Sequence, residues 1–330
     1  MTKVFVTGAS GFIAKHIVKD LLAAGYEVRA SIRSEQRKAE LDALFPDAAL
    51  EFAILDLTSD EGWDAALQGC DVLMHTASPF PMSDPKDPQE LIRPAVDGTL
   101  RALNAALKAG IKRVILTSSN AAIYKDASKP KEAPSDETHW TTADAPFVTA
   151  YEASKTLAER AAWDFVAQHP EIALTTVNPG AVFGPALDSR YGTSLELVER
   201  LMSGKDPMIP PMSLPMVDVR DVSMMHVRAL ELEATKGERF AATAETMRFA
   251  EAVKVLAAWD PALKMAKREA PVWLLRVFAL FMPEAKAVIV SLGRNLSVSG
   301  AKAERVYGFT FIPASDALVS SAETVRKFSS

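Results

Sequence analysis

The chain has 330 residues, of which 48% are hydrophobic and 24% charged, and its formal net charge is −5. This composition is typical of a globular protein with one large domain or two joined ones. Basic and acidic residues are interspersed without a basic stripe, so we expect no nucleic-acid partner. The single cysteine, Cys70, excludes an intramolecular disulfide and favours a reducing compartment.

No segment has the pattern of a targeting signal or a membrane span. The first residues lead directly into a folded-domain motif. The apolar segment 270–283 is short and is interrupted by Arg276, so we expect a buried or cavity-facing helix there. We therefore expect a cytoplasmic protein with no membrane partner.

Short β-branched runs alternate with helical segments through the first half of the chain. In chain order we expect strand 4–7, helix 13–24, strand 26–32, helix 37–45, strand 50–57, helix 63–67, strand 71–76, helix 88–109, strand 114–118, helix 151–168 and strand 173–177. Several strands are nearly continuous apolar runs, which is typical of a parallel sheet covered on both faces. The pattern predicts an α/β fold of the Rossmann type, with a doubly wound parallel sheet.

The sequence changes character after Pro179. Prolines alternate with methionines and leucine over 207–216, which predicts a loop because proline disfavours regular structure. This loop could be a lid over an apolar pocket or a surface loop folded onto its own core, and we favour the lid. We expect residues 1–178 to form the first domain and 179–330 mainly a smaller α/β lobe, with some segments returning to the first domain.

The first predicted strand ends in a glycine turn that is followed at once by an amphipathic helix. Gly8 permits the tight turn, Gly11 permits close approach of the backbone to a pyrophosphate, and Ala14 fills the third small position. The strand before and the helix after the turn are the context that such a motif requires. We therefore expect a dinucleotide to contact Gly8, Ser10, Gly11, Phe12 and Ile13.

The end of the second strand indicates which dinucleotide is bound. An NAD site usually has an acidic residue there to hold the ribose 2′-hydroxyl, whereas this chain has Ser31, followed by Arg33. A guanidinium can bind a 2′-phosphate through two hydrogen bonds. Arg37 and Lys38 open the next helix, where basic residues are also common on a solvated surface. We expect NADP(H) as the cofactor, with contacts from Arg33 and Lys38.

A tyrosine and a lysine one helical turn apart open the helix predicted at 151–168. Their spacing places the Lys155 ammonium below the Tyr151 phenol, where a cation would lower the phenol pKa toward neutrality. The strand 114–118 leads into Ser119 at the carboxyl edge of the sheet, where ligands bind in open α/β folds. Ser119 could donate a hydrogen bond to a substrate carbonyl, or the hydroxyls there could simply bond backbone groups.

Together these motifs resemble the extended short-chain dehydrogenase/reductase superfamily, and especially its dihydroflavonol reductase, cinnamoyl-CoA reductase and microbial ketoreductase branch. The resemblance covers nearly the whole chain and rests on the segments 7–14 (TGASGFIA), 56–57 (DL), 75–79 (HTASP), 117–119 (TSS), 151–163 (YEASKTLAERAAW), 178–180 (NPG), 183–185 (FGP), 217–222 (VDVRDV) and 307–309 (YGF).

The resemblance implies an NADPH-dependent reductase of ketones or aldehydes, built as a bilobed monomer or homodimer with NADP(H) on the N-terminal sheet. Tyr151 would be the acid, Lys155 its activator and Ser119 the donor to the carbonyl. Further implied cofactor contacts are Asp56, Leu57, Thr76, Ala77, Ser78, Tyr151, Lys155, Pro179 and Val182. The chain departs from the family pattern at Ala14, where a third glycine is commoner, and at Asn120, where small residues are usual.

The residues expected to contact the substrate are mostly apolar, which favours bulky or aromatic carbonyl compounds. They are Phe80, Asn120, Tyr124, Met212 and Leu214. We expect no metal site, because the histidines are scattered without ligand spacing, and His75 fits a core position. Two alternatives stay open: an NAD-dependent nucleotide-sugar epimerase or dehydratase on the same fold, and a non-catalytic NADPH-binding sensor.

Overall fold

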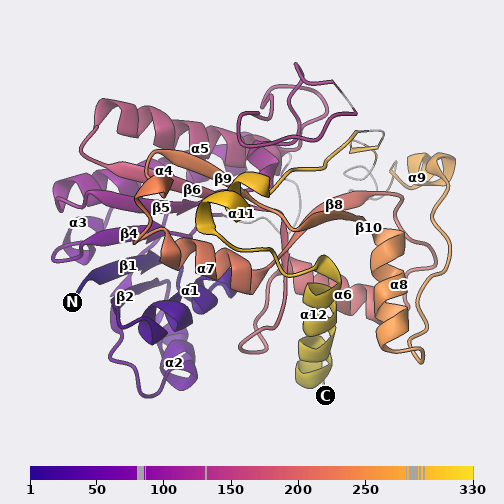
Figure 1. The fold of residues 1–330 in the computed structure, drawn as a ribbon, viewed down its shortest axis with the longest axis horizontal. Helices are drawn as coiled ribbons and strands as arrows, with labels where there is room; N and C mark the ends of the chain where they lie inside the picture. The colour runs from indigo at the N-terminus through magenta and orange to yellow at the C-terminus, as the bar shows by residue number, and fades with distance from the viewer. Residues whose placement is uncertain are drawn as a thin grey trace.

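The computed structural model describes residues 1–79, 85, 87–130, 132–279, 281, 289, 291–292 and 294–329. Its larger layer is a seven-stranded sheet with the order β3-β2-β1-β4-β5-β6-β9, in which every neighbouring pair is parallel (Figure 1). The strands are β1 (Lys3–Thr7), β2 (Glu27–Ile32), β3 (Glu51–Ile54), β4 (Val72–His75), β5 (Arg113–Thr117), β6 (Ala173–Pro179) and β9 (Glu238–Ala242).

Helices cover both faces of this sheet because side chains alternate along each strand. Val4 and Val6 pack in one apolar cluster, while Phe5 between them packs in the other. The cluster of Val4 and Val6 includes residues of α1 (Phe12–Ala23), α2 (Glu35–Leu44), α7 (Val219–Arg228) and α11 (Ala301–Tyr307). The cluster of Phe5 includes residues of α3 (Trp63–Ala66), α4 (Gln89–Lys108) and α5 (Ala150–Gln168). The expected Rossmann-type fold is confirmed.

A second, three-stranded sheet has the order β10-β8-β7 and lies on the right in Figure 1. Its strands are β7 (Ala181–Phe183), β8 (Ser213–Asp218) and β10 (Glu245–Arg248). A third apolar cluster joins this sheet to α6 (Thr193–Ser203), α8 (Phe249–Trp259) and α12 (Ala314–Ser329). Strand β9 lies beyond residue 178 in sequence but pairs with β6 of the larger sheet.

The expectation of a loop over 207–216 is wrong in its second half, because β8 begins at Ser213. Proline is tolerated at Pro215, where β8 pairs with β10 on one side, while pairing with β7 begins only at Met216. The lid hypothesis therefore does not hold for residues 213–216, which belong to the central strand of the small sheet, and for residues 207–212 it stays a prediction.

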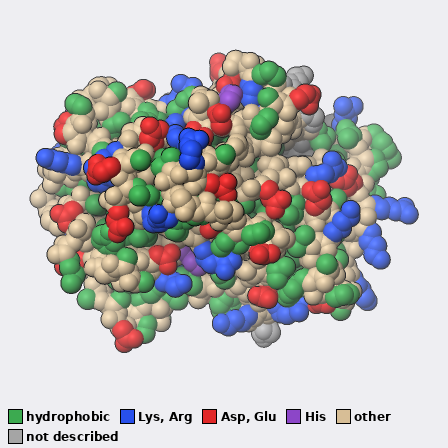
Figure 2. Space-filling model, viewed as in Figure 1, with side chains coloured by type: hydrophobic (Ala, Val, Ile, Leu, Met, Phe, Trp, Pro, Cys, Tyr) green, Lys and Arg blue, Asp and Glu red, His purple; other side chains and the backbone are tan. Residues whose placement is uncertain are grey.

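Helix α9 (Val272–Phe278) lies in the segment 270–283, where a buried or cavity-facing helix was expected, and the expected burial is wrong for this helix. Of its side chains only Leu275 is buried, while Trp273 is 66% exposed and Phe278 42%. Figure 2 shows apolar side chains gathered over this helix. A helix of two turns can pack only one narrow face against the protein. The apolar side chains on its other faces are therefore exposed to solvent. Within the described residues, no helix is both long enough and apolar enough to cross a bilayer.

Candidate active site

The glycine turn between β1 and α1 is shaped by the absence of a side chain at Gly8. Gly8 has φ +62°, and a Cβ added there would lie 3.0 Å from the Cα of Ala77. The Thr7 hydroxyl accepts hydrogen bonds from the backbone N–H groups of Thr76 and Ala77, each at 3.0 Å. These bonds draw the segment after β4 against the turn, so the backbone of both segments borders one crevice.

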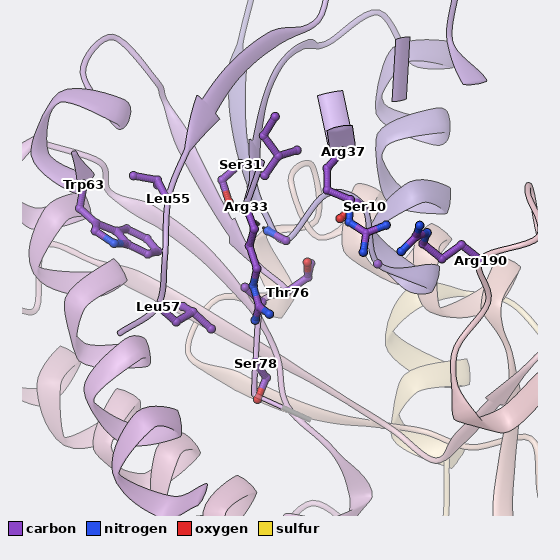
Figure 3. Close-up of a pocket in the computed structure, with 14 residues that line it drawn as sticks. Ser10, Ser31, Arg33, Arg37, Leu55, Leu57, Trp63, Thr76, Ser78 and Arg190 are labelled. Atoms are coloured by element: carbon purple, nitrogen blue, oxygen red, sulfur yellow. Dashed lines mark hydrogen bonds between the residues drawn. The ribbon is translucent and has the colours of Figure 1, made fainter. Parts of the chain in front are cut away.

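A cavity of about 260 Å³ lies at this turn and extends past the end of β2. Its described lining residues are Gly8, Ser10, Gly11, Ser31, Ile32, Arg33, Arg37, Leu55, Leu57, Trp63, Thr76, Ala77, Ser78 and Arg190. Ser31 accepts a hydrogen bond from the Gly8 N–H at 3.0 Å, so the position where an NAD site has an acid instead supports the turn. Figure 3 shows Arg37 and Arg190 close together beside Ser10, with Arg33 reaching toward Ser78.

Two residues expected at the cofactor, Lys38 and Asp56, are among the described lining residues neither of this cavity nor of the one that continues from it. Lys38 is half-buried and pairs with Asp42 at 3.0 Å. Asp56 accepts hydrogen bonds from the backbone and the hydroxyl of Thr58, which hold the pKa of that carboxyl below its ordinary value. Arg37, one residue earlier in α2, lines the cavity instead of Lys38 and points toward Ser10 (Figure 3). Arg190 was not anticipated, since it lies far away in sequence.

A second cavity, of about 500 Å³, continues from the first and shares Gly8, Gly11, Thr76 and Ser78 with it. The candidate catalytic residues Ser119, Tyr151 and Lys155 line it together. The remaining expected cofactor contacts that line it are Phe12, Ile13, Pro179 and Val182. The crevice therefore runs from the arginines at the end of β2 to the hydroxyls at the end of β5.

Helix α5 places Tyr151 and Lys155 at its first turns. A capping box starts the helix: the Thr149 hydroxyl accepts from the Glu152 N–H at 3.2 Å, and the Glu152 carboxylate accepts from the Thr149 N–H at 2.8 Å. The Lys155 ammonium nitrogen lies 5.8 Å from the centre of the Tyr151 ring. Tyr151 is hydrogen-bonded to the side chain of Ser119, so the expected trio meets in space.

Burial shifts the pKa of both groups of this pair. It raises the pKa of the Tyr151 phenol, against a smaller lowering effect of the Ser119 hydrogen bond. The expected net lowering of the Tyr151 pKa is therefore wrong for this structure, because removal from water disfavours the phenolate. Burial also lowers the pKa of Lys155 to about 8, opposed by the nearby carboxylate of Glu159. At neutral pH the phenol holds its proton and most of the lysine is charged.

Glu159 is fully buried one further turn along the same face of α5. Its carboxylate accepts hydrogen bonds from the side chains of Ser118, Trp163, Thr176, Asn178 and Arg239. Asn178 also donates to the carbonyl oxygen of Ser119 at 3.2 Å. This network fixes the helix that holds Tyr151 and Lys155 against the strand end that holds Ser119.

The residues expected at the substrate are only partly brought together. Asn120, Tyr124 and Leu214 line the larger cavity, whereas Met212 is not among its described lining residues and packs in the cluster of the second sheet. Phe80 lies outside the described residues. Residues 192–194, which sequence reasoning missed, also line this cavity, and their polar sequence gave no signal of it.

No cluster of acidic, histidine or cysteine side chains suited to a metal ion occurs in the described part of the chain. His75 is buried, and its Nδ1 is hydrogen-bonded to the Thr7 hydroxyl at 2.9 Å. Burial lowers the pKa of His75 to about 3, so the ring is neutral. The expectation of a core histidine at this position is confirmed.

Comparison with known proteins agrees with this geometry. A sequence model described as "NAD dependent epimerase/dehydratase family" matches residues 4–242. Cinnamoyl-CoA reductase CAD2 from Medicago truncatula is 39% identical over 274 residues, which cover 80% of this chain and 83% of the relative. Ketoreductase azaE from Aspergillus niger is 38% identical over 279 residues, which cover 76% and 81%.

Among solved structures, yeast methylglyoxal/isovaleraldehyde reductase Gre2 in complex with NADPH has a TM-score of 0.83 and 30% identity, over 99% of both chains. The resemblance inferred from the motifs is thereby confirmed. This chain belongs to the NAD dependent epimerase/dehydratase family, that is, to the extended short-chain dehydrogenases/reductases.

Proposed function

We propose that this protein is an NADPH-dependent reductase that converts ketones and aldehydes to alcohols. The observation that carries the proposal is the meeting of Ser119, Tyr151 and Lys155 in one cavity that continues into the glycine turn. A proton donor, a cation and a hydroxyl therefore border the same crevice as the phosphate-binding backbone. That is the set of groups which carbonyl reduction by a nicotinamide requires.

The crevice fits NADPH in both of its distinctive parts. The missing side chain at Gly8 leaves backbone groups free to approach a pyrophosphate at the start of α1. Arg33 and Arg37 border the region where the 2′-phosphate would lie. The position that holds an acid in NAD sites is Ser31 here, so no carboxylate at that position would repel the phosphate. The relative Gre2 was solved with NADPH, which supports the same cofactor for this chain.

When bound, NADPH supplies the hydride that is added to the carbonyl carbon. Ser119 would donate a hydrogen bond to the carbonyl oxygen and hold it beside Tyr151. The Tyr151 phenol would give its proton to that oxygen, so that the C=O group becomes CH–OH and the phenol becomes phenolate. The Lys155 ammonium would stabilise the phenolate charge, which is greatest as the proton leaves.

The lining of the larger cavity favours bulky or aromatic carbonyl substrates. Besides the residues expected at the cofactor, the lining includes the apolar side chains of Ala121, Leu214 and Pro215, together with the ring of Tyr124. The cavity volume of about 500 Å³ includes the part that the nicotinamide end of the cofactor would fill, and the substrate would take the remainder. The names of the relatives, cinnamoyl-CoA reductase and ketoreductase, are consistent with such substrates.

The test follows NADPH absorbance with a panel of aryl ketones and aldehydes. We expect turnover by the wild type and a loss of about 10²–10⁴-fold in kcat for Tyr151→Phe. Tyr26→Phe is the matched control, because Tyr26 is bonded to Glu231 on the surface and precedes β2, whose opposite end borders the crevice. Absence of turnover by the wild type, or full turnover by Tyr151→Phe, would refute the proposal.

Two other functions are separated by the same assay. An epimerase or dehydratase would retain NAD and return the hydride to its substrate, so NADPH would not be consumed. Arg33 and Arg37 at the ribose end argue against that function. A cofactor sensor would bind NADPH without turnover of any carbonyl compound, and the presence of Ser119, Tyr151 and Lys155 in one cavity argues against it.

A further inference from the structure

The loop between β7 and α6 crosses the start of the nucleotide-binding crevice. It is anchored on α1 by two buried side chains of that helix. His16 Nε2 is hydrogen-bonded to the Pro185 carbonyl at 2.9 Å, and the Lys15 ammonium pairs with Asp188 at 2.5 Å. Lys15 also donates to the carbonyl oxygen of Arg190 at 2.9 Å. The backbone of the loop is thus fixed next to the helix whose N-terminus forms the glycine turn.

Because the loop is anchored in this way, the Arg190 side chain lines the same cavity as Arg33 and Arg37 (Figure 3). Arg190 pairs with Glu40 at 3.0 Å, and Glu40 pairs at the same time with Arg37 at 2.8 Å. A single carboxylate therefore holds both guanidiniums at one point. Such a point, with two guanidiniums converging on oxygen atoms, is also suited to a phosphate.

The charges at this point do not balance without a ligand. Among the described residues that line the cavity, the charged ones are Arg33, Arg37 and Arg190. Glu40 pairs with Arg37 and Arg190, and the Asp56 carboxylate interacts with Arg33, so two carboxylates face three guanidiniums and an excess of about one positive charge remains. A phosphate monoester carries a charge of about −1.5 to −2 at neutral pH. The 2′-phosphate of NADPH is such a group, and NADH lacks it.

We propose that Arg190 is a third guanidinium for the 2′-phosphate of NADPH, so that NADPH, unlike NADH, adds a phosphate link between the β7–α6 loop and α2 to the existing Arg190–Glu40 pair. The inference rests on the proposed use of NADPH. It has a structural consequence, because α6 packs with β7 and α12 in the smaller lobe. The phosphate would therefore join the two lobes at the adenosine end of the crevice, remote from the reacting groups.

The test measures the binding of NADP⁺ and NAD⁺ by titration calorimetry to wild type, Arg190→Ala and Arg190→Lys. Because a charge-assisted hydrogen bond contributes roughly tenfold in affinity, Arg190→Ala should raise the Kd for NADP⁺ about tenfold and leave the Kd for NAD⁺ within about twofold. Arg190→Lys should fall between, since an ammonium keeps the charge but loses the planar fork. The loop anchor should persist, because Lys15 contacts the backbone of Arg190.

Arg200→Ala is the matched control, because Arg200 is an arginine of α6 paired with Asp206 and is not among the described lining residues. Its affinities should equal those of the wild type. An unchanged Kd for NADP⁺ in Arg190→Ala, or equal losses for both dinucleotides, would overturn the inference. Equal losses would assign Arg190 to the pyrophosphate instead.

Hydrogen exchange provides the second measurement. Amides of residues 186–192 should exchange more slowly with saturating NADP⁺ than with saturating NAD⁺, and this difference should disappear in Arg190→Ala. Equal protection by both dinucleotides would refute the tie between the lobes. Suppose that the wild type reduces carbonyl compounds with NADPH, and that Arg190→Ala has the wild-type Kd for NADP⁺ and the wild-type amide exchange. In that case only this inference fails. If the wild type neither binds NADP⁺ nor turns over, the proposed function fails with it.

Discussion

Replacing Glu159 by glutamine should damage both the stability of the protein and the pH range of its activity. The side chain of Glu159 is fully buried and that of Arg239 is 10% exposed, with 2.6 Å between the paired atoms. Glutamine keeps the shape but removes the charge, so the Arg239 guanidinium loses its buried counter-ion. Breaking a buried pair on one side costs about 3–5 kcal/mol of unfolding free energy.

The contacts around the second carboxylate oxygen add to this cost. Ser118 and Asn178 donate to the same oxygen of Glu159, at 2.5 and 2.6 Å. In Glu159→Gln one of the oxygens becomes an NH₂ group, which cannot accept a hydrogen bond, so a buried donor loses its partner. We therefore expect a loss of at least about 3 kcal/mol, measured by urea denaturation at pH 7 with the linear extrapolation.

The same variant should shift the pH profile, because the Glu159 charge raises the pKa of Lys155. Without it, the basic limb of kcat/KM should move to lower pH, whereas a purely structural role would reduce activity without moving the limb. Glu171→Gln, at a half-exposed acid, should change stability by less than about 0.5 kcal/mol. A loss below about 1 kcal/mol in Glu159→Gln together with an unmoved basic limb would refute the reasoning.

Three further results follow from single groups. In the wild type, kcat/KM for NADPH should fall as pH rises through about 8, because the Lys155 ammonium is lost there; a flat profile to pH 10 would contradict this. Gly8→Ala forces a side chain into φ +62° and against Ala77, so thermal melting and NADP⁺ titration should show a loss of about 1–2 kcal/mol and weakened binding; wild-type affinity would contradict it. Burial raises the pKa of Asp221 to about 6, so its ionisation opposes folding above that pH. Asp221→Asn keeps an acceptor for the Ile312 N–H, so it should stabilise the protein by about 1–3 kcal/mol at pH 8. This gain in unfolding free energy should shrink as pH falls from 6 toward 4. A gain that does not change with pH would contradict the prediction.

The sequence predicts the larger sheet well because its signals are local. Apolar runs, the glycine turn after β1 and the Tyr151–Lys155 spacing each depend on neighbours within one or two turns of chain. The same local logic fails at Pro215, where proline suggested a loop and the structure has a strand. The missing N–H of a proline disrupts a strand only where a neighbouring strand would accept a hydrogen bond from it. The local sequence does not show which distant strand pairs at that position.

The candidate site shows the same division. Helical spacing was enough to put Lys155 beside Tyr151, and strand ends were enough to bring Ser119 to the same edge. The direction of the Tyr151 pKa required the structure, since burial depends on the whole surrounding fold and outweighed the local hydrogen bond. Arg190 also required it, because its place in the crevice comes from the contacts of the loop with Lys15 and His16. Local chemistry thus determined the glycine turn and the candidate catalytic residues, whereas burial and long-range contacts decided their protonation and the other side chains that line the crevice.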